Sequence, residues 1–539
     1  MRLTIPILLT FFAGFFCIGC SSKSTPAERG IKDGTLLIGL PTEPDSLDPA
    51  LIYSVPVTQI AYGLFEGLVI SDPKEDAKVL PGVASKWEVS ADGLTWTFHL
   101  RSDARWSNGD PVVASDFIYS YQRMLSPRLG ARFASQLYVI KHAKNYHQGT
   151  LSDFSQVGIR APDSHTLIFE LEHPMPTLLL SMTMAYWLPV HPPTIEAAGG
   201  IDSVTARWTT PERMVCNGPF CLEAWSVNHK VVLKPNNCYW DRAHLKLKSV
   251  EFIPFPDAYA EERAFRTGLI HYCSRVPANL LANYENKKSR AFHQEPLMAT
   301  CFLTLNTKHE ALKDVRVRNA LSLVIDRTSI VEKVTLGGEI PATRFTPNGF
   351  PGYPAPDLLH YDLQLAKDLL AQAGYPNGKG LPELEIILTA ILTPHAINEV
   401  QAIAQMWEKS LGVRTRIHAT ELQSYLLAQT QGTFDCARTG WMAAFLDPEA
   451  MLYLWTQNNP NNKSGWYSAQ FDNLLAEANT LNNPSERLAK LADAETLLIE
   501  DMPIIPIYWY SRSYLLDPHV GGWYPKKIDN RPLKFLYFK

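Results

Sequence analysis

Residues 432–448 read G-T-F-D-C-A-R-T-G-W-M-A-A-F-L-D-P, a short apolar run followed by an arginine, a glycine and a tryptophan. The apolar residues predict a short buried strand, and Gly440 would let another backbone approach it closely. Arg438 has two interpretations. With Trp441 it could hold an extended, charged ligand, or it could pair with a local carboxylate in the core, as many ion pairs do. The final D-P pair predicts a turn.

Strand and helix patterns alternate before this segment. Leu384–Leu392 is typical of a strand, Ile397–Leu411 of a helix ended by Gly412, and Val413–Ala419 of another strand. This order predicts a βαβ unit in an α/β fold. The same patterns predict strands at 34–40, 94–100, 231–234, 250–254 and 504–510, a helix beginning at Ala114, and helices at 315–334, 365–373 and 484–500.

The composition is that of a folded protein with several domains. Of 539 residues, 46% are hydrophobic and 19% are charged, which is enough apolar material for a core and too balanced for disorder. The length suggests roughly three domains. A formal net charge of −4 argues against nucleic acid as a partner.

The first residues have the features of an export signal. Arg2 precedes an apolar run from Leu3 to Ile18, and Cys20 follows Gly19. An apolar run that ends in a cysteine before S-S-K-S resembles a bacterial lipoprotein signal, although Cys17 stands where leucine is usual. The resemblance implies that residues 1–19 are removed and that Cys20 is lipidated. Such an anchor tethers the protein to a membrane face and does not span the membrane.

Neither metal ligands nor catalytic motifs stand out. The cysteines lack the spacing of zinc sites, and Cys216 and Cys221, which flank N-G-P, are either a candidate disulfide or two free thiols. There is no G-x-S-x-G elbow, no H-E-x-x-H and no phosphate-binding loop. We therefore expect no cofactor, no metal and no enzymatic activity.

Several long motifs, in order along the chain, carry a family resemblance. They are Y-G-L-F-E-G-L from 62, A-R-W-S-N-G-D-P-V-V-A-S-D-F from 104, N-G-P-F at 217, D-V-R-V-R-N-A-L at 314, A-G-Y-P-N-G at 373, P-I-Y-W-Y at 506 and V-G-G-W at 520. With these motifs the chain resembles the solute-binding proteins of bacterial peptide ABC transporters, and among them the oligopeptide-binding proteins of family 5.

This resemblance implies a two-lobed periplasmic-binding-protein fold with a hinge and an extra third domain. Carried over by motif order, lobe I is discontinuous and comprises 30–65, 177–298 and 511–539. The extra domain II comprises 66–176, and lobe III comprises 299–510. A ligand in such a fold lies between lobes that close over it by hinge bending. An extended peptide can pair its backbone with strands of the cleft.

The resemblance also implies charged residues for the two ends of a peptide, because an unpaired buried charge is costly. This sequence departs from that pattern. The ammonium-binding aspartate of the family, three residues after the G-W tryptophan, falls at Ala444, whereas Asp447 matches a different acidic position. Arg438 is retained. Uncharged residues fall at other charged positions of the family, with Tyr53 and Thr304 at acidic ones and Thr335 and Gln429 at basic ones.

Other residues match cleft positions of the family without being charged. Two positions that form a disulfide in a well-known relative are Ala299 and Met442, so that disulfide is absent. His395 lies near a position where relatives bind the carboxylate of longer peptides. The remaining expected ligand-binding residues are Phe133, Gly440, Trp441, Met442, Tyr508 and Tyr510.

Taken together, these features predict a monomeric, lipid-anchored receptor on the periplasmic side of a bacterial membrane, which captures oligopeptides and delivers them to the permease of an ABC importer. The loss at Ala444 leaves two interpretations open. The ligand could be an N-blocked or peptidoglycan-derived peptide, or the ammonium could be bound by Asp447. The same fold could also carry a non-peptide cargo such as haem or a nickel chelate, or serve as an adhesive or scaffold lipoprotein.

Overall fold

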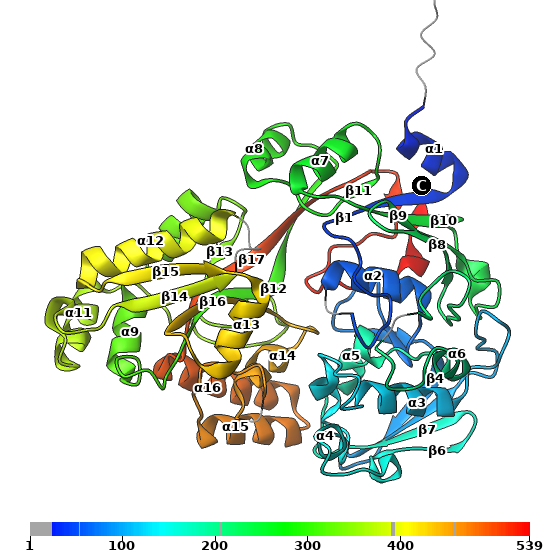
Figure 1. The fold of residues 1–539 in the computed structure, drawn as a ribbon, viewed down its shortest axis with the longest axis horizontal. Helices are drawn as coiled ribbons and strands as arrows, with labels where there is room; N and C mark the ends of the chain where they lie inside the picture. Colours follow the sequence, from blue (N-terminus) through cyan, green and yellow to red (C-terminus); the bar gives the residue numbers. More distant parts are fainter. Residues whose placement is uncertain (1–23, 53, 205–206, 390–393, 458) are drawn as a thin grey trace, which may run out of the picture.

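The computed structural model describes residues 24–52, 54–204, 207–389, 394–457 and 459–539, and it has two halves joined by long strands (Figure 1). The signal segment, Cys20 and Tyr53 lie outside the described residues. Among the described helices, none has both the length and the apolar character needed to cross a membrane.

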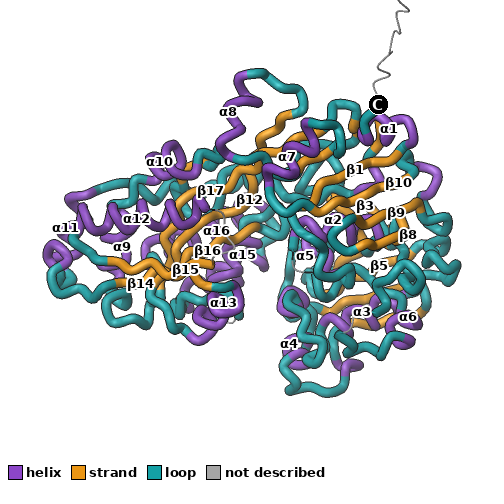
Figure 2. Tube along the Cα trace, turned by 45° about the horizontal axis from the view of Figure 1, so that its top comes forward, coloured by secondary structure: helices purple, strands orange, loops and turns teal. Residues whose placement is uncertain are grey.

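Within the described residues, eleven strands form one mixed sheet that extends through both halves (Figure 2). Its order is β15-β14-β16-β12-β17-β11-β1-β10-β9-β8, with β13 paired to β17. The bounds are β1 Thr35–Leu40, β8 Phe220–Ser226, β9 Lys230–Pro235, β10 Ser249–Pro254, β11 Tyr272–Cys273, β12 Phe292–Leu305, β13 Ile340–Pro341, β14 Leu384–Thr389, β15 Thr415–Thr420, β16 Cys436–Met442 and β17 Ile504–Leu516.

Strands β12 and β17 connect the two halves. They pair with each other in antiparallel fashion, and their register shifts between Pro296 and Thr300. On one side of the shift β12 also pairs with β16, and on the other side β17 also pairs with β11. An interruption of pairing between two well-paired regions is a natural place for the halves to bend relative to each other.

The second half, on the left in Figure 1, contains β14–β16 and the helices around them. Strands β14 and β15 are parallel neighbours connected through α12, which confirms the predicted βαβ unit. Helix α13 ends at Gly432, whose φ of 67° suits glycine, and the chain then enters β16. The helices that pack here are α9 Val315–Leu323, α11 Leu363–Gln372, α12 Pro394–Leu411, α13 Leu422–Gln431, α14 Glu449–Leu452, α15 Ala469–Thr480 and α16 Pro484–Asp501.

The first half, on the right in Figure 1, contains β1, β8–β11 and a separate antiparallel sheet of order β4-β5-β7-β6. This smaller sheet packs in the same hydrophobic core as α2 and α3. The further bounds are α1 Pro26–Asp33, α2 Val55–Leu64, β2 Val69–Ser71, β3 Val79–Pro81, β4 Ala84–Val89, β5 Thr95–Leu100, α3 Ala114–Met124, β6 Ile159–Asp163, β7 Thr166–Glu170, α5 Leu178–Ser181, α7 Ala258–Arg266 and α8 Ala278–Asn286.

The helix predicted at 315–334 is wrong as a single element. Helix α9 ends at Leu323, and a new helix, α10 Arg327–Ile330, begins after Asp326. The carboxylate of Asp326 accepts a hydrogen bond from the backbone N–H of Ser329, as an N-cap does. Asp326 has a non-helical backbone and caps a separate helix, which the apolar spacing did not reveal.

The cysteine pair around N-G-P is close but unlinked. The Sγ atoms of Cys216 and Cys221 lie 3.6 Å apart, and both residues are free thiols. The sequence was compatible with a disulfide or with two thiols, and the structure has the thiols.

Candidate functional site

A cavity of about 310 Å³ lies between the two halves. That volume is within the range of small-molecule and peptide pockets. Most of the lining is apolar or aromatic and comes from both halves: Ile52, Tyr62, Phe133, Val139, Met175, Met184 and Tyr186 from the first half, and Gly440–Phe445, Ala450, Tyr453 and Leu454 from the second.

Five of the expected ligand-binding residues line this cavity, namely Phe133, Gly440, Trp441, Met442 and Ala444. The end of β16 and the two residues after it bring the last four to the boundary between the halves. Pairing of β16 with β12 places Met442 directly opposite Ala299, the two positions of the absent disulfide. The N–H of Ala443 donates to the carbonyl of Met298 over 2.7 Å, so the backbone on both sides of Met442 is fixed.

Arg438 lies deeper in the second half and has a protein partner. Its guanidinium pairs with the Glu399 carboxylate at 3.1 Å and donates to the Tyr508 hydroxyl at 2.8 Å. The same hydroxyl donates to Glu399 over 3.0 Å. Burial raises the pKa of Tyr508 well above its ordinary value, so the phenol stays protonated as a donor. Tyr510 packs edge-on against Tyr508 and limits the space beside Gly440.

An uncharged cluster next to Arg438 holds two further expected residues. Gln429 donates to the Tyr425 hydroxyl at 3.0 Å and to Thr439 at 3.3 Å. Thr304 hydrogen-bonds with the same threonine hydroxyl at 3.2 Å. Thr335 lies elsewhere and donates to Glu339. The positions that are basic in the family therefore hold neutral groups with protein partners.

Asp447 pairs with an arginine of its own half. The guanidinium of Arg487 donates to both of its carboxylate oxygens, at 2.7 and 2.9 Å. A second carboxylate, that of Glu449, accepts from the same guanidinium at 2.9 Å. Burial alone would lower the pKa of Arg487, but the hydrogen bond and the charge of Asp447 raise it above its ordinary value. Asp447 does not line the cavity, whereas Glu449 does.

Glu449 is buried, with 6% of its surface exposed, and its contacts come from both halves. Asn479 donates to one of its carboxylate oxygens at 2.7 Å. Thr177, which precedes α5 in the first half, donates to the other oxygen at 3.0 Å. Glu449 thus lines the cavity and also accepts a hydrogen bond that connects the two halves.

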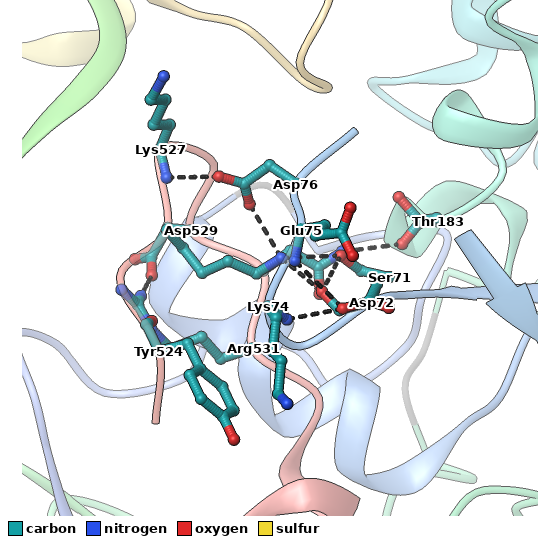
Figure 3. A network of polar contacts seen from close by, with 12 residues as sticks. Ser71, Asp72, Lys74, Glu75, Asp76, Thr183, Tyr524, Lys527, Asp529 and Arg531 are labelled. Atoms are coloured by element: carbon teal, nitrogen blue, oxygen red, sulfur yellow. Dashed lines mark hydrogen bonds and ion pairs between the residues drawn. The ribbon is translucent and has the colours of Figure 1, made fainter. Parts of the chain in front are cut away.

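The C-terminal segment supplies one more carboxylate to the lining, that of Asp529. Figure 3 shows this segment beside the loop of Ser71–Asp76, with Asp529 contacting Arg531. Arg512 also pairs with Asp529, and both arginines contact Glu295. Burial alone would raise the pKa of Asp529, but Arg512 and Arg531 hold it below its ordinary value. Two acids and two arginines therefore balance each other here.

Lys526 holds this segment in place. Its side chain is fully buried, pairs with Asp76 at 2.9 Å and donates to the carbonyl of Asp72 at 2.6 Å. The backbone N–H of Lys527 donates to Asp76 at 2.8 Å. These contacts fix the position of Asp529 at the cavity.

The sequence did not reveal several residues that line the cavity. The structure does not describe the side chains of two residues that the sequence predicted to bind ligand. Tyr53 and the side chain of His395, a residue of α12, lie outside the described part of the structure. Glu449 comes only two residues after Asp447, and the family pattern drew attention to the aspartate. The other missed residues include Tyr62, Tyr186, Tyr453 and Asp529.

The family follows from comparison with known proteins. The sequence profile of the bacterial extracellular solute-binding proteins, family 5 (middle), matches residues 78–463. The chain belongs to this family. It is similar to the periplasmic oligopeptide-binding protein OppA of Escherichia coli K12, with 33% identity over 516 residues, 93% of this chain and 92% of that protein.

Solved structures of family 5 proteins share the fold. The murein tripeptide binding protein MppA of E. coli superposes with a TM-score of 0.81 at 32% identity, covering 94% of this chain and 98% of that chain. The unliganded open form of MppA gives a lower TM-score of 0.74 with the same identity and coverage. The predicted two-lobed periplasmic-binding-protein fold is confirmed.

Proposed function

We propose that this family 5 protein is an extracytoplasmic receptor that captures oligopeptides between its lobes and delivers them to the permease of an ABC importer. The observation that carries the proposal is the cavity, to which both halves contribute and which the end of β16 reaches. In this proposal an extended peptide pairs its backbone with the end of β16, and the aromatic and methionine lining tolerates varied side chains. Binding, and not catalysis, is the proposed role.

The name of the relative MppA, a murein tripeptide binding protein, supports a second candidate cargo. Peptidoglycan-derived or N-blocked peptides would suit a cavity in which the position of the family's aspartate is Ala444. An uncharged peptide end would avoid the desolvation cost that a free ammonium meets in an apolar pocket.

Calorimetric titration of the full-length chain, purified in detergent, tests the function. The probes are tri-, tetra- and penta-alanine, each with a free or an acetylated N-terminus. We expect saturable binding of at least one peptide, accompanied by closure of the lobes in small-angle scattering. If no peptide binds and the scattering does not change, the protein is not a peptide receptor, and mass spectrometry of molecules that co-purify with it should then identify its cargo.

We also propose that Cys20 carries a lipid anchor and that the mature protein is a monomer on the periplasmic side of the membrane. The support is the apolar run followed by cysteine near the N-terminus. Labelled palmitate should enter the wild-type chain and be absent from the Cys20→Ala variant. Equal labelling of both chains would refute the anchor at this residue.

A further inference from the structure

Two groups of carboxylates at or near the cavity differ in the number of arginines that pair with them. Asp529 and Glu295 share Arg512 and Arg531, so that group is electrically balanced. Asp447 and Glu449 share the single guanidinium of Arg487, which leaves one negative charge in excess. The neutral donors Thr177 and Asn479 solvate this charge but do not cancel it.

The excess charge lies at the lining of the cavity. Glu449 lines the cavity, and Asp447 does not. Glu449 is 94% buried, since its exposed fraction is 6%, so water screens its charge poorly. A buried pair of carboxylates that shares one guanidinium favours a second cation beside it, because pairing recovers part of the cost of desolvation.

The rest of the lining is suited to a cation and supplies none of its own. None of the described lining residues is lysine or arginine, and the single lining histidine, His173, is solvent-exposed. Aromatic rings of Tyr62, Tyr186, Trp441 and Tyr453 line the same cavity. The negative faces of such rings attract ammonium groups.

We propose that Glu449 is a cation-binding residue of this cavity and accepts the α-ammonium of a bound peptide in place of the acid missing at Ala444. The inference rests on the proposed peptide-binding function and specifies the chemistry of one ligand end. Glu449 lies five positions after Ala444 and is the first residue of α14. An N-blocked peptide would leave the Asp447–Glu449 pair with Arg487 as its one cation.

The test compares three ligands that differ in one group. Tri-alanine carries the ammonium, N-acetyl-tri-alanine blocks it, and lactoyl-dialanine replaces it by a hydroxyl of similar size. Titrations use the full-length wild-type chain. Removing one partner of a buried charge pair is expected to weaken binding by about 30-fold or more, so tri-alanine should bind that much more tightly than either uncharged ligand.

Variants of the protein identify the residue that causes the preference for tri-alanine. Glu449→Gln should bring the three affinities to within about threefold of one another, because it removes the charge and keeps the shape. Adding Ala444→Asp to that variant places a carboxylate elsewhere in the same cavity and should restore the preference for tri-alanine. Glu310→Gln, at an exposed residue outside the lining, should leave all three affinities unchanged.

The outcomes separate this inference from the proposed function. Equal binding of the three ligands to the wild type, or tighter binding of the acetylated one, overturns the role of Glu449 while leaving a peptide receptor. Retention of the preference in a folded Glu449→Gln variant also overturns it. If that variant does not fold, the hydroxyl ligand on the wild type still decides whether the cavity selects a cation. Binding of no ligand refutes the peptide function and this inference with it.

Discussion

Arg438 has a carboxylate partner within its own half of the molecule. Arg438 and Glu399 are 5% and 0% exposed, and Tyr508 hydrogen-bonds to both. In the sequence this arginine was compatible with a charged ligand or with a core ion pair. The geometry accounts for its retention through the ion pair alone, so the presence of Arg438 is no evidence for a ligand carboxylate.

Neutralising Glu399 should therefore destabilise the fold. Glu399→Gln leaves the Arg438 charge buried without its counter-ion, and we expect the free energy of unfolding to fall by about 3–5 kcal/mol. The double variant Glu399→Leu/Arg438→Met removes both charges and should lie much closer to the wild type. Urea denaturation measures all three chains. A wild-type midpoint for Glu399→Gln would mean that another group compensates Arg438.

At the residue scale, the sequence predicted which part of the chain reaches the cavity but not how its charges pair. The apolar pattern and Gly440 placed β16, and Trp441, Met442 and Ala444 do line the cavity. The partner of Asp447 is Arg487, which lies 40 residues away on α16. No local pattern relates the two, because their contact depends on how α16 packs against the end of β16.

Among the secondary-structure elements, α1, β1 and β11 are joined by one histidine. His271, which precedes β11, is fully buried. Its Nδ1 accepts from the N–H of Leu37 at 2.9 Å, and its Nε2 lies 2.9 Å from the carbonyl of Ala27. The Leu37 donor requires an unprotonated Nδ1, so Nε2 carries the proton and donates to Ala27. The imidazole is therefore neutral in the fold.

Acidification should weaken this connection. Burial lowers the pKa of His271, whereas the unfolded chain takes up a proton near the ordinary value of about 6.5. The stabilising contribution is thus complete above that pH and is lost as the pH falls below it, by up to about 1.4 kcal/mol per pH unit. Thermal unfolding between pH 7.5 and 5.5 measures the effect.

The control for this prediction is a variant at an exposed histidine. The Tm of His229→Gln should fall with pH as the wild type does, while that of His271→Gln should fall less steeply. Parallel curves for all three chains would show that other groups cause the acid sensitivity.

The spacing of apolar residues predicted most helices and strands near the site. It failed where a polar residue begins a new helix. Strands β14 and β15 and helix α12 appear as expected because apolar spacing dominates there. The helix expected at 315–334 is divided because Asp326 caps a new turn and Arg327, buried beside it, donates to the carbonyl of Pro506 at 2.8 Å. Such a contact with β17 is tertiary and has no signature in the local sequence.

At the scale of the whole molecule, two hydrogen bonds among the described residues connect the halves away from the hinge strands. Thr177 donates to Glu449, and Lys527 donates to the carbonyl of Gly349 at 2.7 Å. The arrangement of the halves also gives a higher TM-score with MppA than with its unliganded open form, 0.81 against 0.74. The contact between Thr177 and Glu449 is therefore expected to favour closure.

Replacing Thr177 by valine should shift the molecule toward an open arrangement. The variant keeps the side-chain shape but loses a hydrogen bond to a charged acceptor, which contributes about 1.5–3 kcal/mol. Peptide affinity should fall by about 10-fold or more, and the radius of gyration without peptide should increase. Small-angle scattering and calorimetry measure these effects, with exposed Thr42→Val as the control. Unchanged values for Thr177→Val would show that the contact does not contribute to closure.

The family resemblance predicted the two-lobed architecture, while the domain boundaries of 30–65, 66–176, 177–298, 299–510 and 511–539 stay predictions. It could not predict that Thr177 meets Glu449, because residues 272 apart in sequence come together only through the angle at which the lobes close. Contacts of this kind depend on the whole chain.

The path of the chain also has a consequence for its biosynthesis. Strand β1 pairs with β11, β11 pairs with the last residues of β17, and Lys534 pairs with Asp241 at 2.9 Å. The sheet of the first half is therefore complete only after the final residues have been synthesised, whereas β14–β16 come from neighbouring segments. Until then, β11 has an unpaired edge, which makes the unfinished chain prone to associate with others of its kind.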